Sequence, residues 1–135
     1  MNWLKQFFTW WSGQTLNTRF YTWRQGELVG HDEFGNAYYR SRGGKIDPAL
    51  GFERRWVIFK GYSEATTVPP GWFGWLHHTA ALAPTQESYT GKDWQMPHLS
   101  NMTGSPQAWR PTGSTLSVAA RPHATGDYEA WKPGA

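Results

Sequence analysis

The stretch Leu28-Val29-Gly30-His31-Asp32-Glu33-Phe34-Gly35-Asn36-Ala37-Tyr38-Tyr39 decides the architecture, because it reads as two strands around a tight turn. Glu27–His31 is a predicted strand and Ala37–Arg42 is its return strand. Asp32–Asn36 between them has turn chemistry, since Gly and Asn tolerate a positive φ and an Asp side chain accepts hydrogen bonds from backbone N–H groups. This hairpin predicts an antiparallel sheet.

Two further stretches extend the predicted sheet. Arg54–Lys60 is the clearest strand of the chain, with Trp56 and Ile58 pointing to the same face. Thr15–Trp23 alternates in part between apolar and polar residues, and we expect it to pair at an edge. The sequence therefore predicts a small antiparallel sheet of three or four strands.

Two short helices are predicted around this sheet. The N-terminus has apolar residues at the spacing of one helical face, namely Trp3, Leu4, Phe7, Phe8 and Trp11. A helix this short is marginal alone in water, so a surface of the chain, a partner protein or a membrane interface must stabilise it. The second helix is expected over Trp72–His78, because Pro69-Pro70 suits a first helical turn and Trp72 and Trp75 lie three residues apart.

Residues 84–135 differ in composition from residues 1–83. They hold six Pro, five Gly and eleven Ser or Thr, but only three branched aliphatic residues. Such a segment buries too little area to offset its conformational entropy, so we expect it to be long, extended and without regular structure. Its isolated Trp and Tyr residues favour a strap with spaced anchors over a plain disordered tail. We therefore divide the chain into 1–83 and 84–135, with an α+β fold in the first part.

Composition limits the class of function. The 135 residues include 10 Trp, 6 Tyr and 7 Phe, which outnumber the 14 Leu, Val and Ile residues. Aromatic residues are enriched at protein interfaces, so this inventory favours a chain that folds against a larger partner. The formal net charge of +3 is too weak to imply nucleic acid. The absence of Cys excludes disulfides and Cys-ligated metals, and no sequence run is apolar enough to span a membrane.

No catalytic constellation is evident. His77 and His78 are adjacent on a predicted helix and project about 100° apart, which makes a poor metal chelate. Nothing assembles a nucleophile, a base and an orienting group, so we expect no enzyme activity, no metal and no cofactor. Arg54 and Arg55 instead suit a carboxylate on another protein. Our candidates for partner contact are aromatic, cationic or polar residues, namely Trp3, Phe7, Trp11, Tyr38, Tyr39, Arg54, Arg55, Trp72, Trp75, His77, Trp94, His98, Asn101, Trp109 and Trp131.

Several stretches together resemble one protein family. The hairpin of residues 28–39 is similar to its LVG-x-D-x-FGN-x-YY motif, and residues 54–59 resemble its R-RWV strand. Residues 68–78 resemble its VPP-x-W-xx-WLHH segment, and residues 97–105 with 109–111 resemble its tail. The family is the accessory subunit of respiratory complex I (NADH:ubiquinone oxidoreductase) known as the 17.2 kDa subunit, with the assembly factor mimitin as a paralogue. Gly71 departs from the family pattern, in which Glu is common.

The resemblance implies a non-catalytic accessory subunit that stabilises the peripheral arm of complex I near its junction with the membrane arm. Expected partners are core subunits of the quinone-reducing module, including the two-cluster iron–sulfur subunit, with membrane-interface contact by the N-terminal helix. We expect no nucleic acid partner and no stand-alone homo-oligomer. The lack of an evident presequence favours a bacterial member, peripheral to the cytoplasmic side of the inner membrane, or to the matrix side of the mitochondrial inner membrane in a eukaryote.

Two alternatives remain open at this point. One is a complex I assembly factor that leaves the finished enzyme, like the paralogue. The other is an aromatic-rich module that binds single-stranded nucleic acid or carbohydrate by stacking.

Overall fold

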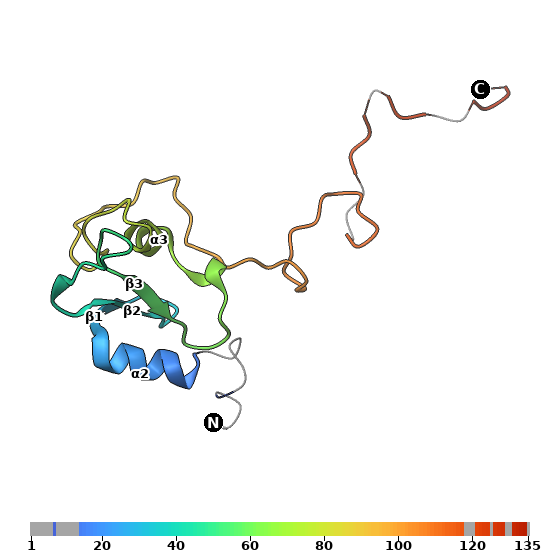
Figure 1. Cartoon of the computed structure of the whole chain (residues 1–135). Helices are drawn as coiled ribbons and strands as arrows, with labels where there is room; N and C mark the ends of the chain where they lie inside the picture. The colour runs from blue at the N-terminus through green and yellow to red at the C-terminus, as the bar shows by residue number, and fades with distance from the viewer. Residues whose placement is uncertain (1–6, 8–13, 118–120, 125, 129–130, 135) are drawn as a thin grey trace. The chain divides into compact units, whose positions relative to one another are not determined.

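The computed structural model describes residues 7, 14–117, 121–124, 126–128 and 131–134. The chain divides into two compact units, Met1–Ser100 and Asn101–Ala135. Among its described residues 14–100, the first unit holds a three-stranded antiparallel sheet in the order β1-β2-β3, with two α-helices (Figure 1). The elements are α2 (Leu16–Gln25), β1 (Gly26–His31), β2 (Ala37–Ser41), β3 (Arg55–Ile58) and α3 (Pro70–Leu76), with 3-10 turns at Arg42–Gly44 and Ala65–Thr67. The predicted α+β fold is confirmed.

The hairpin has the register that its turn dictates, with one irregularity. Leu28 pairs with Tyr39, but Gly30 pairs with Tyr38, so a bulge lies between Leu28 and Gly30. A Cβ atom at Gly30 would lie 3.0 Å from the Trp72 ring. The glycine therefore lets α3 approach the sheet closely at this point.

Asp32 organises the turn, as its place in the sequence predicts. Its Oδ1 accepts hydrogen bonds from the backbone N–H groups of Phe34 (3.0 Å) and Asn36 (2.9 Å). Its Oδ2 accepts from the Asn36 amide and from the Tyr38 hydroxyl, both at 2.8 Å. Asn36 is buried, and its Oδ1 accepts from the backbone N–H of Lys60 at 3.2 Å. Asp32 and Asn36 thus have a structural role in the hairpin.

Helix α2 replaces the edge strand that we expected over Thr15–Trp23, so that prediction is wrong. Thr15 caps the helix, because its side chain accepts a hydrogen bond from the backbone N–H of Thr18 at 3.2 Å. Thr22 on the next turn accepts a hydrogen bond from Trp56 Nε1 at 3.0 Å, which ties the helix to β3. These cap and tertiary contacts outweigh a partial alternation over a few residues.

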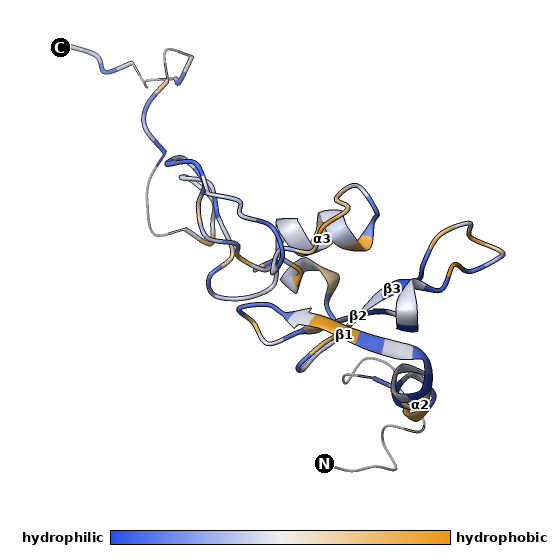
Figure 2. Ribbon diagram, turned by 90° about the vertical axis from the view of Figure 1, so that its left-hand side faces the viewer, coloured by the Kyte–Doolittle hydropathy of each residue, from blue (hydrophilic) through white to orange (hydrophobic). Residues whose placement is uncertain are grey.

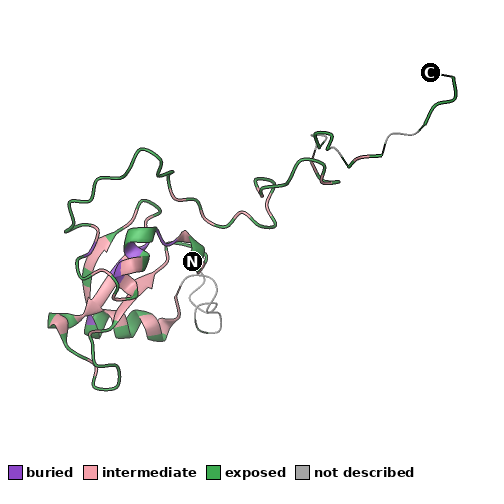
Figure 3. Cartoon of the chain, turned by 90° about the horizontal axis from the view of Figure 1, so that it is seen from above, coloured by how far each residue is buried: buried purple, intermediate pink, exposed green. Residues whose placement is uncertain are grey.

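A small aromatic core lies where α3 covers the sheet. Its buried hydrophobic residues are Tyr38, Val68, Trp72, Trp75 and Ala83. In Figure 3 the buried positions gather at α3 and the adjoining sheet, and most other positions are intermediate or exposed. Figure 2 shows hydrophobic positions on β1, whereas α2 is mainly hydrophilic. Pro70 begins α3 in its first turn, as predicted.

Two sequence predictions concern the ends of the chain. The N-terminal helix of residues 3–11 lies outside the described residues, except for Phe7. The described part of residues 84–135 contains only turns and irregular backbone. Within the described residues, no helix has the length and apolar character that crossing a bilayer would require.

Candidate interaction surface

Three aromatic candidates for partner contact lie in the core of the first unit. The Tyr38 ring stacks on Trp72 with a centroid distance of 3.9 Å and an interplanar angle of 6°. Trp72 meets Trp75 edge-on at 5.6 Å. Burial and the Asp32 carboxylate, which accepts its hydrogen bond, raise the pKa of the Tyr38 hydroxyl well above its usual range. These side chains hold α3 on the sheet and position the surface residues around them.

Tyr39 lies on the opposite side of β2 from Tyr38 and is half-buried. Its ring stacks on Trp56 at 6.1 Å, and Trp56 also contacts the Tyr21 ring at 5.5 Å. This second aromatic group joins α2 to the sheet and is less enclosed than the core.

The adjacent arginines have different surroundings. Arg55 donates to the carbonyl oxygen of Trp75 at 2.7 Å, and its guanidinium lies 4.7 Å from the Trp75 ring centroid. Arg55 also pairs with Glu53 at 2.8 Å, so this side chain stabilises the C-terminal end of α3. The Arg54 side chain is half-exposed and pairs with Asp47. Of the two cations, Arg54 is the more exposed.

The two histidines end α3. His77 is exposed, and its ring lies 4.1 Å from Phe73. His78 has a φ of 59°, in a helix stop in which its N–H bonds the Trp75 carbonyl at 3.1 Å. The centroid of its ring lies 4.3 Å from that of Phe52. Burial is the main cause that lowers the pKa of His78, and the positive charge of Arg55 lowers it further. The residues that the structure describes contain no group of three or more His, Cys, Asp or Glu side chains that could hold a metal ion.

The C-terminal candidates are the most exposed. Trp94, Trp109 and Trp131 have relative exposures of 77%, 85% and 79%. Asn101 accepts hydrogen bonds from the backbone N–H and the hydroxyl of Thr103, which forms a local turn. At the N-terminus Phe7 is 66% exposed, and Trp3 and Trp11 lie outside the described residues.

His98 differs from these residues because it makes contacts within the first unit. Its Nε2 lies 2.8 Å from the Thr66 carbonyl oxygen, and its ring meets Phe34 edge-on at 5.8 Å. These contacts hold the segment before Ser100 next to the hairpin turn.

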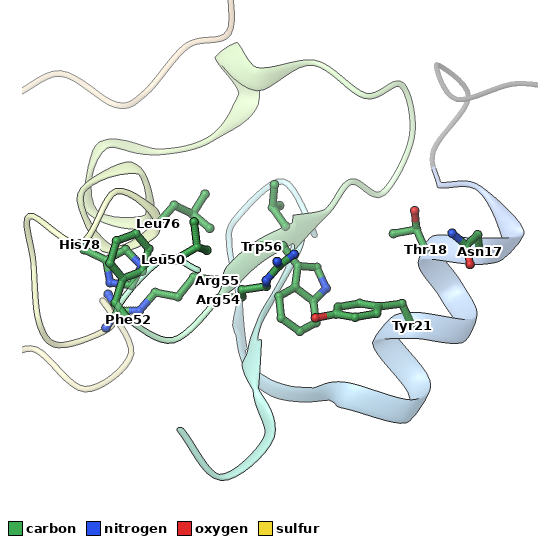
Figure 4. A pocket seen from close by; sticks show the side chains of 11 residues that line it. Asn17, Thr18, Tyr21, Leu50, Phe52, Arg54, Arg55, Trp56, Leu76 and His78 are labelled. Atoms are coloured by element: carbon green, nitrogen blue, oxygen red, sulfur yellow. The ribbon is translucent and has the colours of Figure 1, made fainter. Parts of the chain in front are cut away.

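A hollow of about 530 Å³ lies between α2, β3 and the end of α3. Figure 4 shows Tyr21 and Trp56 on one side of it and Phe52, Leu76 and His78 on the other. Arg54 and Arg55 also line this hollow and add positive charge to it. This mixture of aromatic, aliphatic and cationic side chains has the character of a protein interface.

The outward face of α2 was missed by the sequence reasoning. Phe20 and Trp23 are exposed on this helix, and the candidates above contain neither. The available signal was the helical spacing of Leu16, Phe20 and Trp23 directly after the Thr15 cap. The partial alternation of the same stretch pointed instead to a strand.

The family model described as NADH ubiquinone oxidoreductase subunit NDUFA12 matches residues 26–133. An uncharacterised protein of Rickettsia prowazekii is 46% identical over 84 residues, which are 62% of this chain and 69% of that protein. This bacterial relative fits the expectation of a bacterial member.

Curated relatives carry the name NADH dehydrogenase [ubiquinone] 1 alpha subcomplex subunit 12. The Dictyostelium discoideum protein is 31% identical over 109 residues, which are 78% of this chain and 75% of that protein. The Bos taurus protein is 35% identical over 104 residues, which are 68% of this chain and 67% of that protein. The chain therefore belongs to the NADH ubiquinone oxidoreductase subunit NDUFA12 family, the non-catalytic accessory subunits of complex I.

Proposed function

We propose that this chain stabilises the peripheral arm of complex I near its junction with the membrane arm. The exposure of the C-terminal tryptophans carries the proposal. Trp94, Trp109 and Trp131 are each more than three-quarters exposed on a segment that has no helix or strand among its described residues. A large aromatic side chain gains most by entering a pocket, and Trp is enriched among the residues that dominate interface energies. The segment 84–135 thus has the character of a strap whose anchors fill grooves on other subunits.

The first unit supplies a separate docking face in this proposal. The hollow beside Tyr21, Trp56 and Phe52 holds an apolar side chain of the partner, while Arg54 in its lining donates hydrogen bonds to a carboxylate of the partner. The buried Tyr38 and Trp72 hold this face in shape. Because the core is small, contact with a larger partner adds stability that the chain alone lacks.

The partners in this proposal are core subunits of the quinone-reducing module, including the two-cluster iron–sulfur subunit. The chain is peripheral to the membrane, on the cytoplasmic side in a bacterium and on the matrix side in a mitochondrion. The N-terminal segment with Trp3, Phe7 and Trp11 contacts the membrane interface. The chain acts within the complex and not as a homo-oligomer.

Truncation tests the strap. Removing residues 101–135 deletes the second unit and leaves the first unit entire. We expect the thermal unfolding of the purified chain to stay unchanged, and its retention in detergent-solubilised complex I to fall. A matched variant with Trp109 and Trp131 changed to Ala keeps the length of the strap and should show the same loss. Full retention of both variants would contradict the strap, and their recovery only on partly built complexes would favour an assembly factor.

A further inference from the structure

Helix α2 contacts β3 through Thr22 and Tyr21, and it leaves a stripe of two aromatic side chains, Phe20 and Trp23, exposed to solvent. Its contacts with β3 are the hydrogen bond from Trp56 Nε1 to Thr22 (3.0 Å) and the Tyr21 ring contact. Phe20 and Trp23, by contrast, are 57% and 73% exposed, and their ring centroids lie 5.8 Å apart. None of the helix residues is buried. Exposed aromatic side chains add no hydrophobic stabilisation to the isolated chain. The stripe therefore has the properties of an interaction surface.

Cations gather beside this stripe. Arg24, Arg42, Lys45 and Arg54 line a hollow of about 440 Å³ that borders Phe20. Asp47 is the single acidic residue of that lining, and it already accepts hydrogen bonds from Arg54 and from a backbone N–H. These hydrogen bonds hold the pKa of Asp47 below its usual value, so the carboxylate stays ionised and engaged.

The other three cations of the lining, Arg24, Arg42 and Lys45, differ in their hydrogen bonds and ion pairs within the chain. Arg42 donates to the carbonyl oxygens of Trp23 (3.2 Å) and Gly26 (3.3 Å), which fixes its guanidinium at the end of α2. No ion pair joins Arg24 or Lys45 to a carboxylate anywhere in the described residues. Glu27 lies near Arg42 and offsets part of its charge. Among the described residues that line the hollow, four are cationic and one is acidic, so its lining carries an excess of positive charge.

The uneven shape of this surface favours a protein as its binding partner over a flat lipid surface. Trp23 lines a second hollow, of about 450 Å³, on the side of α2 where Leu28 and Tyr39 lie. The exposed aromatic pair is thus a ridge between two recesses. Protein interfaces fill such recesses at the packing density of an interior, and their central residues are enriched in aromatic side chains and Arg.

From this geometry we propose that the outward face of α2 docks an acidic segment of another subunit of the same complex. Apolar side chains of that segment pack against Phe20 and Trp23, and its Asp or Glu carboxylates meet Arg24, Arg42 and Lys45. The docking rests on the proposed function, because it places the chain within complex I. It adds a second attachment that is independent of the C-terminal strap.

Photo-cross-linking in native membranes tests the proposal. A tagged full-length chain carries p-benzoyl-phenylalanine in place of Trp23, whose side chain is exposed. After irradiation the tag is purified, and mass spectrometry identifies both the co-purifying subunits and the cross-linked peptide. We expect a peptide from another complex I subunit with Asp or Glu residues next to apolar ones. A lipid adduct, a peptide without acidic residues, or no cross-link would overturn the docking.

Charge reversal completes the experiment. The double substitution Arg24→Glu with Lys45→Glu is introduced into the chain that carries p-benzoyl-phenylalanine at position 23. It should lower the cross-link yield by at least about tenfold, because the new glutamates then repel the acidic segment of the partner. Lys60→Glu with Lys92→Glu changes the net charge equally at positions outside both hollows, and should leave the yield unchanged. If the double reversal disturbs folding, as circular dichroism would show, Lys45→Glu alone at an exposed loop position replaces it. Equal yields for reversal and control would overturn the charge pairing.

The same purification separates the two proposals. Complex I subunits recovered without the expected cross-link would overturn only the docking face. An acidic peptide from a protein outside complex I, with no complex I recovered, would overturn the proposed function.

Discussion

Trp72 gives the sharpest test of the core. The side chain is only 4% exposed, stacks on Tyr38 at 3.9 Å and meets Trp75 edge-on at 5.6 Å. Burying roughly 200 Å² of aromatic surface at about 25 cal/mol/Å² corresponds to about 5 kcal/mol, which is an upper value because the unfolded chain is itself partly compact. Trp72→Ala should therefore lower the free energy of unfolding by about 3–5 kcal/mol. Small domains have about 5–15 kcal/mol in total, so the loss is a large share.

Trp23 provides the matched control. It is also a tryptophan, but it is 73% exposed. Trp23→Ala should change the stability by less than about 0.5 kcal/mol. Urea unfolding followed by far-ultraviolet circular dichroism measures both variants without relying on tryptophan fluorescence. If the two variants lost similar stability, or if Trp72→Ala lost less than about 1 kcal/mol, the stacked core described above would be refuted.

Three further substitutions test particular contacts by thermal or urea unfolding. Tyr38→Phe removes a buried hydroxyl that donates to a carboxylate, and should cost about 1.5–3 kcal/mol; an unchanged stability would show that the bond contributes nothing net. Trp56→Phe removes the indole donor to α2 and should cost about 1 kcal/mol, a result that an unshifted midpoint would contradict. The folded-state pKa of His78 lies below the ordinary 6.5, so the unfolded chain binds the extra proton first and stability should fall as the pH drops below about 6.5. His78→Gln should flatten that dependence, and a profile equal to that of the unchanged chain would refute the assignment.

The hairpin and α3 were predictable because their signals are local. Asp32 satisfies N–H groups two and four residues ahead, and Pro70 lies in the first turn of α3. Neither depends on distant parts of the chain. The turn type and the helix start therefore follow from residues that lie close together in the sequence.

Helix α2 was not predictable from the same reasoning. Thr15–Trp23 carries both a partial alternation and a helical stripe, and a short segment does not decide between them. The hydrogen bond between Trp56 and Thr22 joins residues 34 positions apart, and only the folded chain displays it. A tertiary contact of this kind lies beyond local pattern reasoning.

The candidate site was predictable in kind but not in detail. Aromatic residues serve both cores and interfaces, so the sequence did not separate the buried Tyr38 and Trp72 from the exposed Trp94 and Trp109. Arg54 and Arg55 are adjacent, yet one pairs at the surface and the other anchors α3. Burial depends on the whole fold. It therefore separates residues of the core from exposed candidates for partner contact only once the structure is known.

Co-purification from native membranes tests the central claim most directly. The chain, tagged at its N-terminus, is expressed in its own host, the membranes are solubilised in mild detergent, and mass spectrometry quantifies what accompanies the tag. We predict recovery of the whole of complex I with NADH oxidation activity and the chain at one copy per complex. Recovery of assembly intermediates alone, or of no complex I subunit, would contradict a permanent stabilising role in the peripheral arm.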